Sequence, residues 1–212
     1  RFVLVSLGCA FNCSYCPHKL GAGDSESRPA EEILCQVRHL LDDGAKTIVL
    51  TGIDTASYGA DSGSSFPALL ERILALPDNT AQYHIAQFNP EALSSRKQRE
   101  HMAACCSDHR VVDLQLPIQT TSARLLSLMR RNYHANQVAE FVSNVKTRNP
   151  DLFMRTDLLV GLPTETEEEL IRTVQFTARC YNEAAVYGFE PKAGTAIVSS
   201  SLPFWDRDTI AR

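Results

Sequence analysis

Short apolar runs alternate along the chain with longer stretches in which apolar residues recur at helical spacing. The runs are rich in β-branched residues and predict strands at 1–8, 46–54, 82–89, 111–118, 152–161 and 183–190. The stretches between them predict helices at 29–43, 65–76, 90–106, 121–148 (in two pieces) and 165–180. Strands that alternate with helices of this length are typical of βαβ units, whose right-handed crossovers build a parallel sheet. The pattern therefore predicts an α/β fold.

Two of the helix starts carry clear local signals. Ser27 and Pro29 precede one acidic first turn, and Pro163 and Thr164 precede the glutamates 167–169. We interpret these glutamates as a helix N-terminus that complements the helix dipole, and not as functional carboxylates. The final stretch, 199–212, has the composition of a turn. We expect it to leave the core as an extension or linker, with residues 1–198 forming one domain.

Length and composition are those of an ordinary globular domain. The chain has 212 residues, enough for one α/β domain, with 44% hydrophobic and 22% charged residues. No apolar run is long enough to cross a bilayer and nothing resembles a signal peptide, so we expect a cytoplasmic protein without a membrane partner. The net charge of −4 argues against a broad nucleic-acid-binding face. We interpret the basic pair Arg130 and Arg131 as a solvated helix end.

Three of the seven cysteines, Cys9, Cys13 and Cys16, lie close together in the loop after the first predicted strand. The spacing C-x3-C-x2-C lets one loop wrap a face of an iron–sulfur cluster, and soft thiolates favour zinc or iron–sulfur sites. Cys35 lies on the following helix and is not expected to reach back, so one coordination position stays open. The alternative is a zinc site completed by His18. We interpret the other four cysteines as structural residues of helices: Cys35, Cys105, Cys106 and Cys180.

The carboxyl ends of the predicted strands are the expected location of a functional site. In parallel barrels and open sheets, the working groups gather at these ends. Five of them are polar or glycine-rich here: GCAFNC, TGIDTASYG, QFNPE, PIQTTS and VGLPTET. Because the cysteine loop directly follows the first strand, we expect it on the same rim as the other four.

The stretch CAFNCSYC resembles the hallmark of the radical S-adenosylmethionine (SAM) superfamily, in which an aromatic residue precedes the third cysteine. The resemblance implies a partial (β/α)6 barrel of the TIM type and a [4Fe–4S] cluster held by Cys9, Cys13 and Cys16. It also implies that SAM binds the fourth iron and is cleaved to a 5′-deoxyadenosyl radical, with an electron donor such as flavodoxin or ferredoxin. Other stretches are similar to the methylthiotransferases within this superfamily: SRPAEEIL, IVLTGIDTASYG, LPIQTTSARLLSLMRRNY, RTDLLVGLPTETEEEL and EPKAGTA.

The resemblance also implies which residues contact SAM. The positions that match the family's motifs are Tyr15, Thr51, Gly52, Asp54, Gln119, Arg155, Gly161 and Phe189. Tyr15 is expected beside the adenine, and Gly161 would let the backbone approach the same ring. Asp54 and Arg155 have an equally good interpretation as members of an interstrand ion pair.

The family's reaction would be methylthio modification of a tRNA base or of a protein aspartate, and DTASYG is more similar to the aspartate-modifying branch. Several stretches depart from the family pattern: GAGDSE after the cysteine loop, QTTS after the fourth strand, and Asn89 where a glutamate is usual. Family members carry an N-terminal domain with three more cysteines and a C-terminal substrate-binding domain, and we expect both to be absent from this chain. Alternatives are other radical SAM chemistry, such as methylation with cobalamin or peptide modification, and a degenerate barrel that serves as a scaffold.

Overall fold

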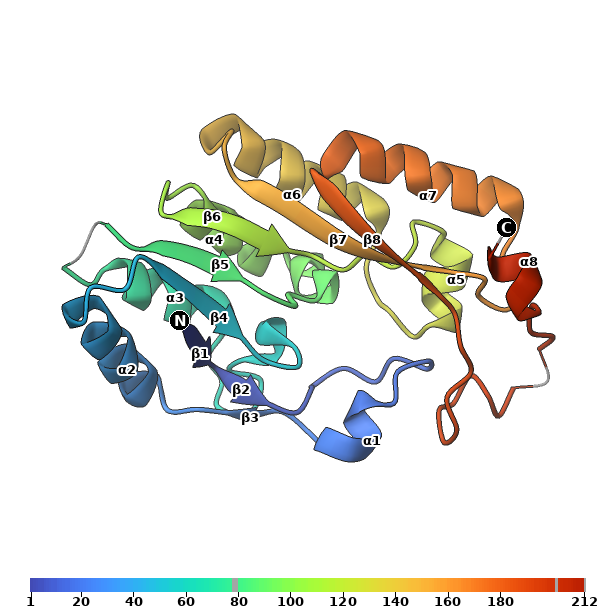
Figure 1. Ribbon diagram of the computed structural model, residues 1–212, viewed down its shortest axis with the longest axis horizontal. Coiled ribbons are helices and arrows are strands. Elements are labelled where there is room, and N and C mark those ends of the chain that lie inside the picture. The colour runs from blue at the N-terminus through green and yellow to red at the C-terminus, as the bar shows by residue number, and fades with distance from the viewer. Residues whose placement is uncertain (78–79, 201, 212) are drawn as a thin grey trace.

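The computed structural model describes residues 1–77, 80–200 and 202–211, and it is built on a six-stranded sheet (Figure 1). The strands are β1 (Phe2–Leu4), β4 (Thr47–Thr51), β5 (Gln82–Ile85), β6 (Val111–Gln115), β7 (Phe153–Val160) and β8 (Glu183–Gly188). They pair in chain order, and every pair is parallel. In the described residues the two outer strands, β1 and β8, do not pair with each other, so the sheet stays open as a partial barrel. All six predicted strands and the parallel α/β fold are confirmed.

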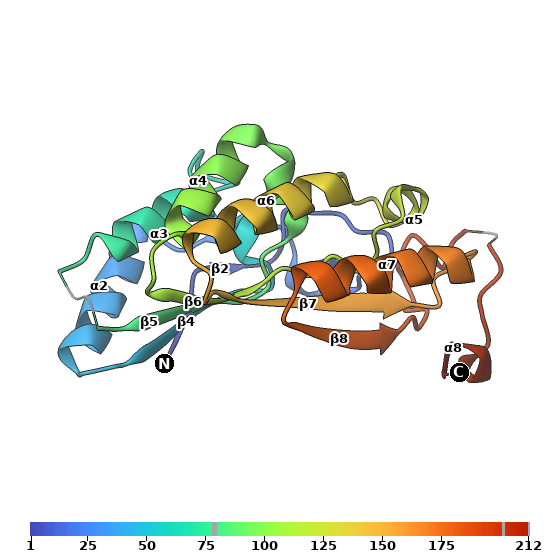
Figure 2. The same cartoon turned by 90° about the horizontal axis from the view of Figure 1, so that it is seen from above.

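Long helices cover one face of this sheet. They are α2 (Ala30–Asp42), α3 (Phe66–Leu74), α4 (Arg96–Cys106), α6 (Ala135–Arg148) and α7 (Glu167–Cys180). Figure 2 shows α3, α4, α6 and α7 on the same side of the strands. Each predicted helix is present, although 90–106 is divided into a 3-10 turn, η2 (Pro90–Ser94), and α4. Nowhere in the described parts of the chain does a helix combine the length and the apolar character that crossing a membrane requires.

Several short elements were not predicted. They are α1 (His18–Ala22), α8 (Arg207–Ala211), the 3-10 turn η1 (Thr55–Ser57) and β3 (Glu26–Ser27). The predicted strand 1–8 is divided into β1 and β2 (Ser6–Leu7), and β2 pairs antiparallel with β3. The predicted stretch 121–148 divides as expected, into α5 (Ala123–Leu128) and α6. The elements that were not predicted have at most five residues, too few for a hydrophobic period, and tertiary contacts hold them.

The sheet has one face packed against the helices and one open face. Successive residues of a strand point to opposite faces. On β4, Ile48 and Leu50 are fully buried and belong to the core with Ile33 of α2 and Phe66 of α3. Thr51, on the opposite face of β4, is half-buried. We call the face opposite the helices the open face.

The two helices with clear start signals in the sequence, α2 and α7, are both present, but neither Ser27 nor Thr164 caps them. Ser27 lies on β3, where its Oγ accepts a hydrogen bond from the backbone N–H of Gly59 at 2.8 Å. Helix α7 is capped by Thr166, whose Oγ1 accepts from the backbone N–H of Glu169 at 3.3 Å. The Glu169 carboxylate accepts from the backbone N–H of Thr166 in return, at 3.0 Å. The glutamates 167–169 thus form a helix N-terminus, as interpreted, because this capping box satisfies two free N–H groups.

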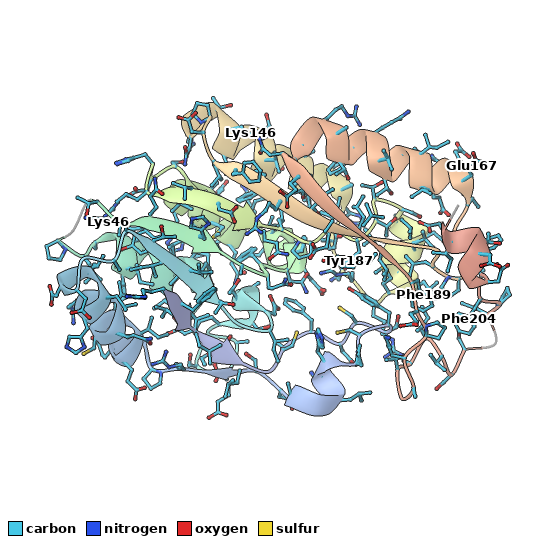
Figure 3. All side chains as sticks on the ribbon, viewed as in Figure 1. Lys46, Lys146, Glu167, Tyr187, Phe189 and Phe204 are labelled. Atoms are coloured by element: carbon cyan, nitrogen blue, oxygen red, sulfur yellow. The ribbon has the colours of Figure 1, made fainter. Side chains whose placement is uncertain are left out.

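The last residues return to the barrel, although we expected 199–212 to leave the core. The ring of Phe204 stacks on that of Phe189, just after β8, with the centroids 6.0 Å apart (Figure 3). Ile210 of α8 lies against Gly161, where an added Cβ would come within 2.5 Å of the Cγ1 of Ile210. The end of the described chain therefore packs on the carboxyl ends of β7 and β8.

Glu169 is expected to stabilise the fold at neutral pH. Burial alone would raise its pKa, but hydrogen bonds from Arg124, Ser122 and Thr166 outweigh this effect and lower the pKa to about 2. A carboxyl whose pKa is lowered on folding contributes stability above its ordinary pKa and loses it as the pH falls toward the folded value. Glu169→Gln should therefore lower the free energy of unfolding at pH 7 by up to about 3 kcal/mol, with the difference shrinking between pH 4.5 and pH 2.

Urea unfolding of both proteins across this pH range measures the effect. Glu168→Gln is the matched control, because that side chain is 77% exposed and forms an ion pair at 3.0 Å with Arg172, one helical turn away on the same exposed face. Its change in unfolding free energy should stay below about 0.5 kcal/mol. An equal loss in both variants would contradict the role of Glu169.

Candidate functional site

A cavity of about 200 Å³ opens at the carboxyl ends of the first four sheet strands. Its lining residues are Cys9, Phe11, Cys13, Tyr15, Cys16, His18, Lys19, Ile53, Asp54, Gln87, Asn89, Pro117, Gln119 and Arg131. All three clustered cysteines line it, facing residues that follow β4, β5 and β6. The expected meeting of the cysteine loop with these strand ends on one rim is confirmed.

The start of the cysteine loop depends on Gly8. This residue has a φ of 62°, in the left-handed region that favours glycine, and an added Cβ would lie 1.9 Å from the carbonyl oxygen of Asp24. The next residue, Cys9, donates its backbone N–H to the carbonyl of Gly23 at 3.3 Å. The loop therefore leaves β2 along a path that a side chain at position 8 would block.

Ser14 ties the middle of the loop to two distant segments. Its backbone N–H donates to the carbonyl of Met129 at 2.9 Å, and its Oγ donates to the carbonyl of Leu128 at 2.7 Å. Its own carbonyl accepts from the backbone N–H of Ile197, in the segment after β8, at 2.9 Å. Ser14 is 4% exposed. The segment that carries Cys13 and Cys16 is thus fixed to the end of α5 and to the segment after β8.

Removing the Ser14 hydroxyl is expected to loosen this attachment. Ser14→Ala deletes one buried hydrogen bond but leaves both backbone bonds, so it should cost about 1 kcal/mol of unfolding free energy. We expect the iron-loaded variant to lose iron to a chelator several-fold faster than the parent protein. Ser107→Ala is a matched control. Ser107, at the end of α4, donates its Oγ to the carbonyl of Ala103 at 2.7 Å, the same length as the bond removed in Ser14→Ala. Equal rates of iron loss in the two variants would contradict the positioning role of Ser14.

The thiols of Cys9 and Cys13 have raised pKa values and stay protonated at neutral pH as long as nothing is bound to them. Burial is the main cause that raises the pKa of Cys13 to about 11; Arg131 opposes this shift, and the neighbouring thiols Cys16 and Cys9 add to it. Burial also raises the pKa of Cys9, and the charge of Asp54 adds to this. Metal binding needs the thiolate, so loading this site should release protons.

Asp54 forms part of the cavity wall next to Cys9. It is 5% exposed, and one carboxylate oxygen lies 3.8 Å from the sulfur of Cys9. The same carboxylate accepts hydrogen bonds from the hydroxyl of Ser57 at 2.7 Å and from the backbone N–H groups of Ala56 at 3.0 Å and Asn89 at 3.2 Å. Desolvation raises its pKa, although these bonds oppose the effect. Asp54 thereby joins the loop after β4 to the loop after β5.

Arg131 is the main site residue that sequence reasoning missed. It is not a solvated helix end, because it is 7% exposed and lines the cavity. Its guanidinium donates to the carbonyl of Pro117 and to Oδ1 of Asn89, both at 2.8 Å, and lies 5.6 Å from the centre of the Tyr133 ring. Its Nε is buried and has no hydrogen-bond partner among the described residues. Arg130 before it has a φ of 56°, and this turn directs the chain from α5 back into the rim.

The residues expected to contact SAM fall into two groups. Tyr15, Asp54 and Gln119 line the cavity. The others lie outside its lining: Thr51, Gly52, Arg155, Gly161 and Phe189. Tyr15 also packs against a second apolar cluster that contains Phe189 and Leu162, the residue after Gly161.

Arg155 forms the interstrand ion pair that was the alternative interpretation. Its Nε lies 2.9 Å and its Nη2 2.6 Å from the two carboxylate oxygens of Asp113 on β6. In the register of the two strands, Arg155 lies opposite Gln115, and Asp113 lies opposite Phe153. Both ionic side chains therefore stand on the open face of the sheet, two positions apart in register. Asp54 was the other residue expected either to contact SAM or to form an interstrand ion pair. Its carboxylate is instead held by hydrogen bonds from Ser57 and from backbone N–H groups, and it lines the cavity.

The remaining cysteines lie away from the cavity. Cys105 and Cys106 are buried in the main core on α4, and Cys180 is half-buried at the end of α7. Cys35 is exposed on α2, so it is not the core residue that helix composition indicated. None of these four lines the cavity, and the three thiols of the loop are left without a fourth cysteine there.

The donor set fits an iron–sulfur cluster better than a single metal ion. In the described residues, no three His, Cys, Asp or Glu side chains are grouped as ligands of one ion, although His18 lines the same cavity. A cluster suits thiols that surround a cavity, since each thiolate binds a different iron. The unpartnered Nε of Arg131 offers a buried donor to an anionic group beside the same thiols.

The chain is similar in sequence to proteins of a known family. Residues 3–177 match the family model of the radical SAM superfamily. The chain is 32% identical over 206 residues to a threonylcarbamoyladenosine tRNA methylthiotransferase of Danio rerio, which covers 96% of this chain and 37% of that protein. It is 32% identical over 211 residues to a tRNA-2-methylthio-N(6)-dimethylallyladenosine synthase of Moorella thermoacetica, covering 95% and 46%. The chain thus spans less than half the length of these relatives.

Solved structures share the fold at lower identity. A radical S-adenosylmethionine methyltransferase from Kitasatospora setae, with cobalamin and a [4Fe–4S] cluster bound, aligns with a TM-score of 0.70 at 18% identity, over 88% of this chain and 36% of that one. Coproporphyrinogen III oxidase of Escherichia coli, a radical SAM enzyme, aligns with a TM-score of 0.63 at 15% identity, over 95% and 48%. At these identities the likeness concerns the architecture alone.

Proposed function

The chain belongs to the radical SAM superfamily, and we propose that it is the catalytic core of a tRNA methylthiotransferase. Cys9, Cys13 and Cys16 would hold a [4Fe–4S] cluster, and the cavity beside them would hold SAM. When bound, the cluster supplies the electron that cleaves SAM to methionine and a 5′-deoxyadenosyl radical, which removes hydrogen from a substrate. The electron would come from a donor such as flavodoxin or ferredoxin.

One observation carries this proposal. Three thiols of one loop line a cavity to which the chain brings no fourth cysteine among its described residues. A closed structural site uses four protein ligands, whereas a site that binds a reactant keeps a position open. The rim location supports the same interpretation, because the site is formed by loops after parallel strands.

The chain's own residues would bind and orient the cofactor. The charge of Arg131, held rigidly by Asn89 and Pro117, suits the carboxylate of SAM. Gln119 lines the same wall and offers a carboxamide to the ribose hydroxyls. Tyr15 and Phe11 add aromatic surface that excludes water from the reacting atoms.

The relatives support a tRNA substrate. Both relatives named above carry tRNA methylthio modification in their names, and each aligns over at least 95% of this chain. We place the catalytic core at residues 1–198 and assign 199–212 to an extension packed against it. The other cysteines, scattered over α2, α4 and α7, offer no second group of cluster ligands, so the 212-residue polypeptide is not expected to transfer sulfur by itself.

Reductive cleavage of SAM tests the proposal directly. The protein is reconstituted with iron and sulfide without oxygen, then mixed with SAM and a chemical reductant, and 5′-deoxyadenosine and methionine are measured. We expect both products in equal amounts, at a slow rate without substrate, and none from Cys13→Ala. An iron-loaded protein that forms no 5′-deoxyadenosine would favour a scaffold role instead.

A further inference from the structure

A second cavity borders the cysteine loop. It has a volume of about 310 Å³, and Phe11 of the loop lines both this cavity and the cysteine cavity. Its other walls come from residues 56–67, which lead from η1 into α3, and from residues 88–98, which lead through η2 into α4. Glu91 is the one charged residue among the described residues that line it. We call it the Glu91 cavity.

The carboxylate of Glu91 has a buried oxygen that lacks a partner. No hydrogen bond from the described part of the chain reaches Oε2, although the residue lines a cavity and is only half-buried as a whole. Its backbone N–H donates to Oδ1 of Asn89 at 3.1 Å, which fixes the first turn of η2. A buried acceptor without a donor is costly, and the cost is greater when the acceptor is charged. A bound group that brings a donor would remove this cost.

The chain's own cations do not provide that donor. Arg131 and Glu91 both act on the pKa of Cys13, after the larger effect of burial, and Arg131 lowers it whereas Glu91 raises it. The guanidinium of Arg131 nevertheless donates to Pro117 and Asn89, and it lines the cysteine cavity instead of the Glu91 cavity. The charge of Glu91 is therefore left for a cation from outside the chain, and a charged donor forms the stronger hydrogen bond.

The rest of the Glu91 cavity is apolar or neutral. Phe66 and Phe88 are fully buried in its wall, with ring centroids 5.7 Å apart, and Phe11 adds further aromatic surface. The exposed lining residues at its rim are small and uncharged: Ala10, Ala60, Ser64, Ser94 and Ser95. The cavity thus offers apolar walls to a hydrocarbon stem, one anionic oxygen to a cation, and a rim without a second charge.

A lysine side chain matches these features better than other cations. Its four-carbon stem packs on apolar surface while its ammonium remains a compact point charge, which a single oxygen can bind. The planar fork of arginine suits two carboxylate oxygens together. A free diamine would leave its second ammonium at the rim, where the described lining residues carry no carboxylate.

The position of the cavity would connect a docked lysine to the cysteine loop. Ser57 lines the cavity, and its Oγ accepts a hydrogen bond from the backbone N–H of Ala10 at 2.9 Å. The same Oγ lies 3.9 Å from the sulfur of Cys9. A group in the cavity would therefore contact the segment of the loop between Cys9 and Cys13.

We propose that the Glu91 cavity is a docking site for a lysine side chain of a protein partner, with the ammonium on Glu91 and the stem along Phe11, Phe66 and Phe88. The proposal goes beyond the proposed function and does not depend on SAM cleavage. It assigns this part of the rim to a protein contact.

Calorimetric titration with two capped amino acids tests the proposal. One is Nα-acetyl-lysine methylamide, and the other carries a hydroxyl in place of the ammonium. We expect the parent protein to bind the lysine compound at least about fivefold more tightly, because only the lysine compound forms a charged hydrogen bond. Both titrations are run on the protein before and after reconstitution, so that the result is independent of cluster assembly.

Variants of the cavity locate the binding. Glu91→Gln keeps the size of the side chain but removes its charge, and it should abolish the preference for the lysine compound. Glu32→Gln is the matched control, because Glu32 is an exposed carboxylate of α2 that does not line the cavity. Ala92→Leu fills the cavity from η2 and should weaken binding of the lysine compound at least about fivefold. Melting temperatures show that each variant is folded.

Three results would overturn the inference. The first is a parent protein that binds both compounds alike or binds neither. The second is a Glu91→Gln variant that retains the preference for lysine. The third is 1,5-diaminopentane binding more tightly than the capped lysine, which would make the ligand a free diamine instead of a protein side chain. Loss of SAM cleavage with an intact lysine preference would contradict the proposed function and leave the docking site supported.

Discussion

Cys13→Ala is expected to leave the reconstituted protein without iron and without the visible absorbance of a cluster. The parent protein should bind about four irons per chain, because the three thiolates hold three corners of one [4Fe–4S] cluster. With one thiolate missing, two ligands in a cavity open to solvent are too few to retain it. Cys9→Ala and Cys16→Ala should give the same result. Iron content, sulfide content and the absorbance spectrum after anaerobic desalting measure the effect.

The other cysteines serve as controls in the same experiment. Cys35→Ala changes an exposed residue of α2 and should alter neither iron content nor stability. Cys105→Ala lies in the core and should lower stability while leaving the iron content unchanged. His18→Ala addresses the zinc alternative, because it would reduce metal binding only if His18 were a ligand. An unchanged iron content in Cys13→Ala would contradict the assignment of the cluster.

The long helices and the strands of the six-stranded sheet could be predicted from the hydrophobic pattern, because most of them have enough apolar positions to show it. The stretch 152–161, for example, is rich in apolar residues and contains polar ones at alternate positions, and it forms β7 from Phe153 to Val160. The five-residue helices α1 and α8 gave no such signal, since packing of Leu20 near Gly194 and of Ile210 against Gly161 holds them. The return of the tail to the barrel depends on the same contacts between distant segments.

The cysteines of the site were predictable because they lie in one loop, whereas Arg131 was not. A basic pair after a helix usually faces solvent. Only the partners of Arg131 in the segments after β5 and β6, Asn89 and Pro117, reveal that it is buried. Its one local signal is Tyr133 two residues later, whose ring supports the guanidinium. Likewise, the pairing of Arg155 with Asp113 depends on the register of two strands, which the sequence pattern does not determine.

Arg131→Met is expected to weaken SAM binding at least about tenfold while the cluster still forms. A hydrogen bond to a charged group contributes about 1.5–3 kcal/mol, and 1.4 kcal/mol corresponds to a tenfold change in affinity. The variant also removes the donor to the carbonyl of Pro117 and one of the two donors to Oδ1 of Asn89, so a lower melting temperature is expected. The dissociation constant of SAM, measured by titration of the reconstituted protein below that temperature, separates binding from stability.

Neighbouring variants decide whether the charge itself or its geometry is required. Arg130→Met is the matched control, because it removes the adjacent but exposed arginine and should leave SAM affinity unchanged. Arg131→Lys keeps the positive charge but cannot make both hydrogen bonds of the planar guanidinium, so it should bind SAM with intermediate affinity. Equal SAM affinities for Arg131→Met and Arg130→Met, at equal iron content, would remove Arg131 from the cofactor site. The buried position of Arg131 beside the thiols, with its Nε unpartnered, makes the opposite result the expected one.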